Sequence, residues 1–146
     1  LDKNMKVDMF ICQLSTNDAT KGSALGIVGE SYKLEDFDTS TVAGAIGYII
    51  CYAQATWSCP VGFYTSLKYD SESYEQMYQL LLQIQHKWGI AVLDFWNNDE
   101  INAHKKSTHM ADKIHPTMLC YRDDLTPAFY EFIEDVTIAS CSCTLY

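Results

Sequence analysis

Residues 7–14 read VDMFICQL, an almost unbroken apolar run near the start of the chain. A half-exposed strand would alternate apolar and polar side chains, so this run predicts a strand that is covered on both faces, as in a parallel sheet. Two further apolar runs of strand length follow at residues 61–65 (VGFYT) and 90–95 (IAVLDF). We therefore expect three strands, each buried between helices.

Segments with helical periodicity alternate with these strands. Residues 42–57 follow the capping sequence DTST at 38–41, and their apolar residues recur at three- and four-residue spacing. Residues 71–88 carry the clearest helical pattern, and residues 117–136 predict a third helix. Pro127 should interrupt this helix, which then forms two segments or begins late. The alternation predicts an α/β fold: a doubly wound parallel sheet with helices on both faces.

Two polar segments follow strands in this pattern, at residues 15–40 and 96–113. In parallel α/β sheets, functional residues gather on the loops that leave the carboxyl ends of the strands. Long connections of this kind are also usually functional. We therefore expect the site to be built from these two segments.

The composition is that of an ordinary globular chain of 146 residues with a net charge of -9. This charge argues against a nucleic-acid partner, because phosphate binding requires clustered Lys and Arg. No apolar stretch reaches the roughly 18 residues that a membrane-spanning helix needs, and the chain as given begins without a signal peptide. A cytoplasmic and a secreted protein both fit these features, so the compartment stays open.

The six cysteines fit two interpretations, a disulfide framework or buried free thiols. Cys12 and Cys51 lie in apolar runs, and a chain of this length does not require disulfides to build a core, so we expect free thiols. Cys141 and Cys143 are close enough in sequence to ligate a metal, but no second pair accompanies them at zinc-site spacing. We expect no metal site here.

Asn17 is the first candidate site residue, in the sequence STND at 15–18, where the first strand ends. In one interpretation, Asn and Asp at this place cap the strand end by bonding their own backbone. In the other, the Asn17 amide donates a hydrogen bond to negative charge that develops during a reaction. These four residues alone do not decide between the two.

Asp112 and His115 form the second candidate, in the sequence DKIHPT at 112–117. A carboxylate three residues before a histidine can accept the imidazole Nδ1 proton, which fixes the tautomer and leaves Nε2 free as a base. The alternative is a histidine beside a helix start with an incidental Asp. The other histidines have no partner motif and are expected to be solvated: His86, His104 and His109.

Taken together, the two motifs resemble those of the SGNH (GDSL-type) serine esterase and lipase family. FICQLSTND at 10–18 is similar to the family's third sequence block, usually G-x-N-D. DKIHPTMLCYRDDLTPAFYEFI at 112–133 is similar to its fifth block and C-terminal helix, and WGIAVLDFW at 88–96 fits the strand that leads to that block. The likeness runs from about residue 7 to residue 136.

This resemblance implies a role for each candidate residue. Asn17 would be an oxyanion-hole donor, His115 the general base that activates a serine, and Asp112 the residue that orients His115. The implied substrate is an acyl or acetyl ester, such as an acetylated carbohydrate or a lipid, cleaved through an acyl-enzyme. The family's chemistry needs no metal and no cofactor.

The chain departs from the family pattern in three places. Ser15 and Cys120 stand where the family usually has glycine. The G-D-S motif of the first block, which holds the nucleophilic serine, does not occur in the sequence, nor does a clear second-block glycine. We therefore expect residues 1–146 to be a single SGNH-like domain, incomplete at its N-terminus, that supplies strands three to five of a sheet ordered 2-1-3-4-5.

This placement leaves the strand at residues 7–14 with one unpaired edge, a hazard that natural domains avoid. We expect an N-terminal fragment of the same domain to pack there and to carry the serine. Ser66, after the second strand, is another hydroxyl near the site, but it lacks the tight strand-to-helix turn that exposes a nucleophile. On its own, the chain should have the fold and little or no activity.

Two other functions fit parts of the pattern. A non-catalytic binding module would retain the fold without a nucleophile. A flavodoxin-like nucleotide binder would need a glycine-rich phosphate loop after the first strand, and STNDATKG at 15–22 does not supply one. Of the aromatic residues near the site, Tyr64 and Trp96 could line a pocket, although core packing is the simpler expectation for each.

Overall fold

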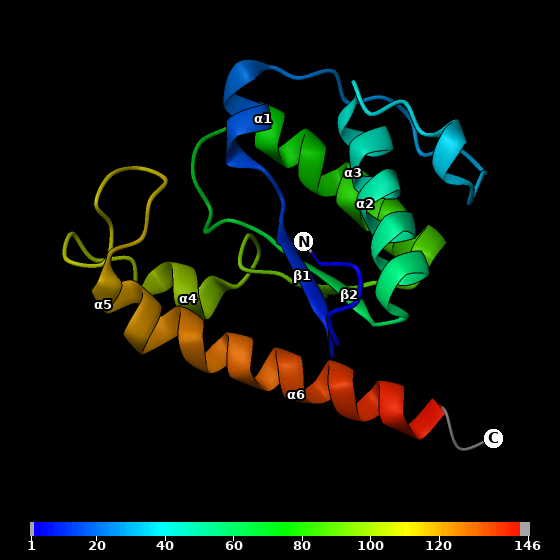
Figure 1. Ribbon diagram of the computed structural model, residues 1–146. Coiled ribbons are helices and arrows are strands. Elements are labelled where there is room, and N and C mark those ends of the chain that lie inside the picture. Colours follow the sequence, from blue (N-terminus) through cyan, green and yellow to red (C-terminus); the bar gives the residue numbers. More distant parts are fainter. Residues whose placement is uncertain (1, 144–146) are drawn as a thin grey trace.

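Three parallel strands form the centre of the protein in the computed structural model, which describes the backbone of residues 2–143 (Figure 1). β1 (Phe10–Gln13), β2 (Val61–Tyr64) and β3 (Ala91–Leu93) lie in that order, each hydrogen-bonded to its neighbour. Both pairings are parallel. The predicted strands are confirmed, although each is shorter than its apolar run.

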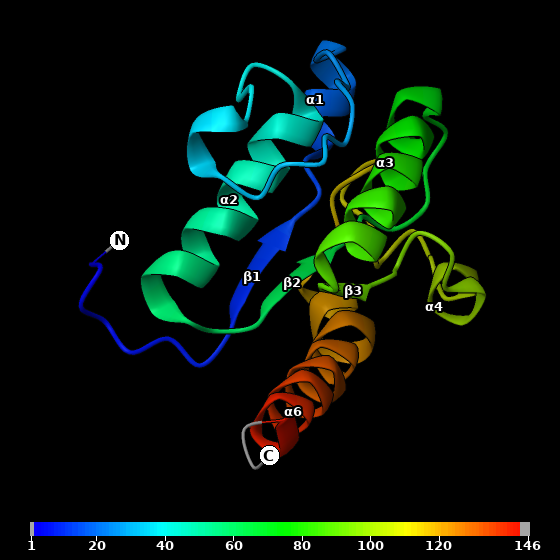
Figure 2. The same cartoon turned by 90° about the vertical axis from the view of Figure 1, so that its right-hand side faces the viewer.

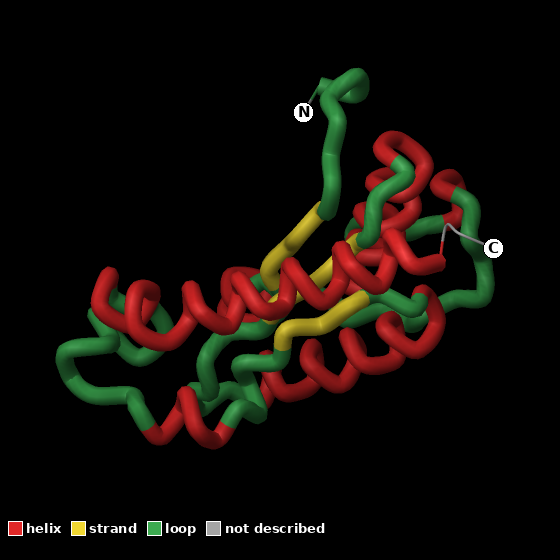
Figure 3. The backbone as a smooth tube through the Cα atoms, turned by 90° about the horizontal axis from the view of Figure 1, so that it is seen from below, coloured by secondary structure: helices red, strands yellow, loops and turns green. Residues whose placement is uncertain are grey.

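Helices cover both faces of this sheet. α2 (Val42–Trp57) and α3 (Glu72–Trp88) lie on one face, and α6 (Thr126–Cys143) lies on the other (Figure 1; Figure 2). α6 crosses the strands, whereas the segment before β1 extends away from the sheet (Figure 3). The predicted α/β fold, a parallel sheet flanked by helices, is confirmed. Within residues 2–143, no helix is long and apolar enough to cross a membrane.

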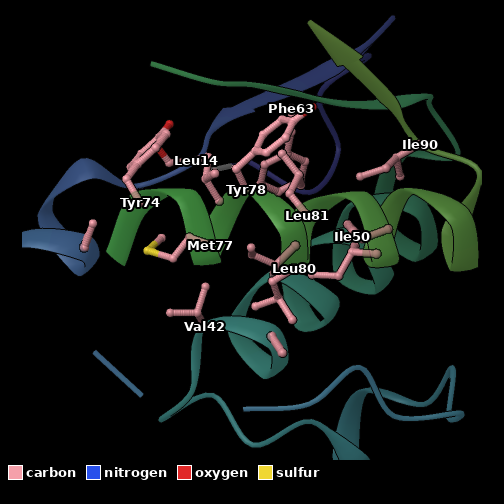
Figure 4. Packing of buried hydrophobic residues seen from close by; sticks show 14 of the residues in the cluster. Leu14, Val42, Ile50, Phe63, Tyr74, Met77, Tyr78, Leu80, Leu81 and Ile90 are labelled. Atoms are coloured by element: carbon pink, nitrogen blue, oxygen red, sulfur yellow. The ribbon is translucent and has the colours of Figure 1, made fainter. Parts of the chain in front are cut away.

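The larger hydrophobic core lies between the sheet and the pair α2 and α3 (Figure 4). Four α3 side chains at helical spacing are each at most 2% exposed: Tyr74, Met77, Leu81 and Ile84. A smaller core on the other face contains Phe95, Cys120 and Leu125, all buried. Apolar side chains therefore cover the strands on both faces, which is why their sequences do not alternate.

Two short helices lie in the segments that were expected to be polar connections. α1 (Thr16–Lys21) follows β1 directly, and the Ser15 hydroxyl caps it by accepting a hydrogen bond from the Asp18 amide at 3.1 Å. α4 (Asp99–Ala103) is capped in the same way by Asn98. Both helices are too short to show an apolar period, so only their capping residues could have predicted them.

The last helix is continuous from Met118, through α5 (Met118–Cys120) and the π-helical turn η2 (Tyr121–Leu125), into α6. No break in the helix occurs at Pro127, but the regular helix α6 begins late, at Thr126, after the π turn. The π turn rearranges the hydrogen bonds at Thr126, whose N–H donates to the Tyr121 carbonyl, and a residue without an N–H is accommodated next to such a change. The helix also continues beyond its predicted end at residue 136.

Lys87 holds the long connection before α2 against α3. Its ammonium donates hydrogen bonds to the carbonyl oxygens of Gly29, at 2.6 Å, and Ser31. It also lies over the rings of Tyr32 and Trp88, 4.5 and 5.0 Å from their centroids, in cation–π geometry. The connection is therefore an ordered part of the fold.

The cysteines whose side chains the structure describes are free thiols: Cys12, Cys51, Cys59 and Cys120. Burial raises the pKa of Cys12, Cys59 and Cys120 above the ordinary value, which makes these thiols poor nucleophiles. The expectation of free thiols is confirmed for these four. The side chains of Cys141 and Cys143 lie outside the described part.

A buried tyrosine joins the segments that leave β1 and β2. The Tyr74 hydroxyl accepts a hydrogen bond from the Ser66 amide at 2.7 Å and donates one to the Leu14 carbonyl at 3.2 Å. Tyr74 is 0% exposed and lies beside Leu14 in the core (Figure 4). The positions at which the chain leaves these two strands are therefore fixed relative to each other.

A threonine makes the equivalent connection between β2 and β3. The Thr65 hydroxyl accepts a hydrogen bond from the Trp96 amide at 2.8 Å and donates one to the Asp94 carboxylate at 3.2 Å. Thr65 is 1% exposed. Together with Tyr74, it holds the carboxyl ends of all three strands in one arrangement.

Tyr74→Phe should destabilise the protein, because it leaves the Ser66 N–H and the Leu14 carbonyl buried without a partner. Each of these two groups costs about 1–3 kcal/mol, so we expect the free energy of unfolding, measured by urea denaturation, to fall by about 2–6 kcal/mol. Tyr69→Phe is the matched control, because within the described residues the buried Tyr69 hydroxyl makes no hydrogen bond. The polar neighbour of the Tyr69 hydroxyl is Ser71, which accepts the Tyr74 amide, so removal of the Tyr69 hydroxyl leaves no backbone group at the strand ends without a partner. Equal losses in the two variants would contradict this role for Tyr74.

Candidate active site

A cavity of about 230 Å³ lies at the carboxyl edge of the sheet. Its wall is built by the end of β1, α1, the segments after β2 and β3, the loop before α5, and η2. It is lined by Gln13, Thr16, Asn17, Tyr64, Thr65, Ser66, Leu67, Phe95, Ile114, His115, Pro116, Tyr121 and Leu125. α1 and the loop between α4 and α5 lie toward the same end of the strands (Figure 1). Asn17 and His115, which come from distant motifs, are therefore brought to one cavity.

Asn17 occupies the first turn of α1, and its side chain is exposed. The Ser15 hydroxyl accepts the capping hydrogen bond at this turn, so the Asn17 side chain does not cap the helix. Among the described residues, the Asn17 amide makes no side-chain hydrogen bond of its own. It is therefore free to donate to a molecule in the cavity.

Asp112 and His115 form a hydrogen-bonded pair. Oδ2 of Asp112 lies 2.7 Å from Nδ1 of His115, and Oδ1 accepts the backbone N–H groups of Ile114 and His115 at 2.7 and 2.8 Å. These two backbone bonds, followed by the bond to the imidazole, lower the pKa of Asp112 to about 2. The ionised carboxylate keeps the His115 proton on Nδ1, which leaves Nε2 available to a reacting group.

The Asp112–His115 pair lies on the surface, with 57% and 70% of the two side chains exposed. Its loop closes on itself: Met110 and Pro116 form an isolated antiparallel bridge, and the Ala111 amide donates to the His115 carbonyl at 2.8 Å. The pair is therefore built by its own loop and not by burial in the core.

Ser66 lines the cavity with His115, but it is not arranged as a nucleophile. It is 6% exposed, and its backbone amide is held by Tyr74. In the described part of the chain, no serine hydroxyl is hydrogen-bonded to His115.

The described part of the chain also contains no group of three or more His, Cys, Asp or Glu side chains that could hold a metal ion. The site thus brings together an imidazole, the carboxylate bonded to it and a side-chain amide.

Several residues of the cavity wall were not predicted, among them Gln13, Thr16 and Tyr121. The Tyr64 hydroxyl donates to the Gln13 side-chain oxygen at 3.3 Å, and burial raises the pKa of Tyr64 above its ordinary value. Tyr64 therefore lines the cavity, whereas Trp96 is 2% exposed in the core. Gln13 is the polar residue within the strand-forming sequence FICQ, and that break in the apolar pattern was a signal for it.

The expectation of solvated histidines is wrong for His109. Only 14% of its side chain is exposed, and its Nε2 lies 3.7 Å from Oδ2 of Asp124. His104 is 55% exposed, with Nδ1 3.3 Å from Oδ1 of the same Asp124, whereas His86 is exposed as expected. Asp124 is distant from both partners in the sequence, so no local motif could have predicted these contacts.

Two solved crystal structures resemble this protein in fold. One, of a Lactobacillus plantarum protein from the Northeast Structural Genomics consortium, has a TM-score of 0.71 and 16% sequence identity, and the match covers 92% of this chain and 69% of that one. A second has a TM-score of 0.75 and 17% identity, and the match covers 93% of this chain and 67% of that one. At these identities the likeness shows the α/β fold alone. No protein-family model matches the sequence, and no curated protein matches it significantly.

Asp112 should remain ionised down to a pH of about 2, its folded-state pKa. Because this pKa lies below the ordinary value of 3.8, the carboxylate stabilises the folded loop above about pH 4, and this contribution is lost as the pH falls toward 2. A ¹³C NMR titration of the Asp carboxyl groups measures it. In His115→Ala the pKa should rise but stay below 3.8, since both backbone N–H donors remain. Titration of Asp112 near 3.8 in the unsubstituted protein would contradict the geometry.

Proposed function

We propose that this protein is a serine ester hydrolase of the SGNH type, in which residues 1–146 supply the base and an oxyanion donor. The observation that carries the proposal is the cavity that Asn17 and His115 share. Asp112 is bonded to the Nδ1 side of His115, so the imidazole presents Nε2 as a base. The sequence resemblance implies the same roles for these three residues.

In the proposed reaction, Nε2 of His115 takes the proton of a serine hydroxyl while the serine oxygen attacks the ester carbonyl. The carbonyl oxygen becomes an oxyanion, to which the Asn17 amide donates a hydrogen bond. Asp112 stabilises the imidazolium. His115 then gives the proton to the leaving alcohol. Water, activated by the same histidine, finally releases the acid from the acylated serine.

The cavity supports a substrate with a small acyl group. Its volume of about 230 Å³ lies below the roughly 300–1,000 Å³ of sites for drug-sized ligands. Its wall also carries polar side chains, including Gln13, Thr16 and Tyr121. We therefore favour an acetyl or similarly short ester of a polar alcohol, such as a carbohydrate, over a lipid ester.

The proposed nucleophile is a serine on a further segment of the same protein, packed beside β1. Among the described residues, β1 pairs only with β2 and lies at one end of the sheet (Figure 2). Beside it, an apolar cavity of about 180 Å³ is lined by Phe10, Tyr48, Ile49, Tyr52, Ala53 and Trp57. An open strand edge with an aromatic cavity next to it suits another strand and helix. The matches also leave roughly a third of each similar chain uncovered.

The alternative is a binding module that retains the fold and has no nucleophile. The observation that favours it is the absence of a serine hydroxyl bonded to His115 in the described part of the chain. Such a module would hold an ester or sugar in the same cavity without turnover.

His115→Ala should abolish hydrolysis of p-nitrophenyl acetate by the full-length gene product, lowering kcat by about 10³-fold or more because the serine loses its base. Asn17→Ala should lower kcat by about 10²–10³-fold, as expected for the loss of one oxyanion donor. His86→Ala is the matched control, since this exposed histidine on α3 should not affect turnover. Full activity in His115→Ala would sink the assignment of the base.

Labelling with a fluorophosphonate probe, followed by mass spectrometry of the labelled peptide, locates the nucleophile. We expect the probe on a serine outside residues 1–146. A label on Ser66 would overturn the proposed position of the nucleophile. A protein that takes no label, yet shows NMR shifts at Asn17 and His115 with an acetylated sugar, would support the binding module.

A further inference from the structure

A second histidine–carboxylate contact, between His109 and Asp124, lies at the base of the loop that carries the Asp112–His115 pair. His109 stands at the neck of the loop that carries this pair: its carbonyl accepts the Thr117 amide at 2.8 Å. The Thr117 hydroxyl also donates to the Thr108 carbonyl at 2.8 Å. Thr108 and His109 on one side and Thr117 on the other form the neck of the loop and are bonded to each other. Asp112 and His115 lie in the segment that this neck closes.

The His109 side chain connects this neck to the helix. Its Nε2 faces η2, 3.7 Å from Oδ2 of Asp124 and 3.9 Å from Oδ2 of Asp123. Its Nδ1 lies 3.1 Å from the Thr108 hydroxyl. Both ring nitrogens therefore have polar neighbours, and the ring is 14% exposed, in contrast to the 70% of His115.

Of the two carboxylates, Asp124 is the one available to the imidazoles. Asp123 is 40% exposed and is held by Arg122, whose Nε and Nη2 donate to it at 2.5 and 2.9 Å. Asp124 is 11% exposed, and its Oδ1 lies 3.3 Å from Nδ1 of His104. Asp124 therefore contacts both His104, where the loop begins, and His109, at its neck.

Two further features surround Asp124: a buried thiol, Cys120, and the π turn η2. Burial, with the nearby Asp124 as a further cause, raises the pKa of Cys120, so this neighbour is a neutral thiol. The π turn places Asp123 and Asp124 beside the loop, and π turns are frequent where a helix serves a functional site. The proposed reaction uses none of these four residues: Asp123, Asp124, His104 and His109.

We infer that His109 and Asp124 are positioning residues, which fix the neck of the loop so that the exposed Asp112–His115 pair keeps its geometry. Neither touches the reacting atoms. His115 lies two residues from Thr117, whose amide is bonded to the His109 carbonyl. Movement of the backbone at the neck would therefore displace His115 directly. The inference about geometry stands on these contacts, and its meaning for catalysis rests on the proposed function.

The test is the tautomer of His115, read by long-range ¹H–¹⁵N NMR of the imidazole rings at pH 8, where an ordinary imidazole is neutral. The unsubstituted protein should show the proton on Nδ1 of His115. His109→Ala should convert this signal to the mixture of tautomers of a free imidazole. His109→Gln should retain the signal, because its amide nitrogen can take the place of Nε2 beside Asp124. Asp112→Asn identifies the signal by removing the acceptor itself.

An unchanged His115 tautomer in a folded His109→Ala protein overturns the inference, and so does an equal loss in His109→Ala and His109→Gln. Where His109→Ala does not fold, Asp124→Ala removes the same contact from the helix side and should give the same loss; an unchanged tautomer there also overturns it. The NMR result does not depend on turnover, so a full-length gene product that is inactive but shows the expected tautomers would reject the esterase proposal alone. In an active protein, His109→Ala should lower kcat at least tenfold with little change in KM, and His109→Gln should restore it.

Discussion

The hydroxyl of Tyr74 accepts the Ser66 amide and donates to the Leu14 carbonyl, at the place where the chain leaves β1 and β2. The strands are only three or four residues long, and the hydrogen bonds between them end with the Leu14 and Thr65 amides, at the edge of the cavity. Buried backbone groups beyond that point need another partner, and the helix α3 provides it through one side chain. The Tyr74 hydroxyl therefore fixes the distance between the cavity wall that carries Asn17 and the wall formed after β2.

The site beyond this constraint is built in two different ways. Its orienting carboxylate is held locally, since the Asp112 side chain bonds backbone N–H groups two and three residues ahead. The placement of that loop is tertiary, because the neck meets η2 through His109 and Asp124. A locally complete motif can therefore sit on an exposed loop and still be aimed at a cavity by contacts far along the chain.

Most of the fold could be predicted because long elements repeat their apolar pattern. α2 and α3 each bury one face over several turns, and the strands lie in apolar runs. The failures have physical causes. α1 and α4 are too short for a period and depend on single capping residues. Pro127 signalled a break that the π turn absorbs, and His109 looked solvated because Asp124 is remote in sequence.

The sequence by itself determined the order of strands and helices, the parallel sheet and the Asp112–His115 spacing, since these follow from residue periodicity and from contacts within a few residues. Only the tertiary structure decided that Asn17 and His115 line the same cavity, that Tyr64 and Gln13 belong to its wall while Trp96 is in the core, and that His109 is packed against the helix. These facts depend on side chains that meet across the sheet edge, and no spacing along one chain segment encodes where another segment will lie.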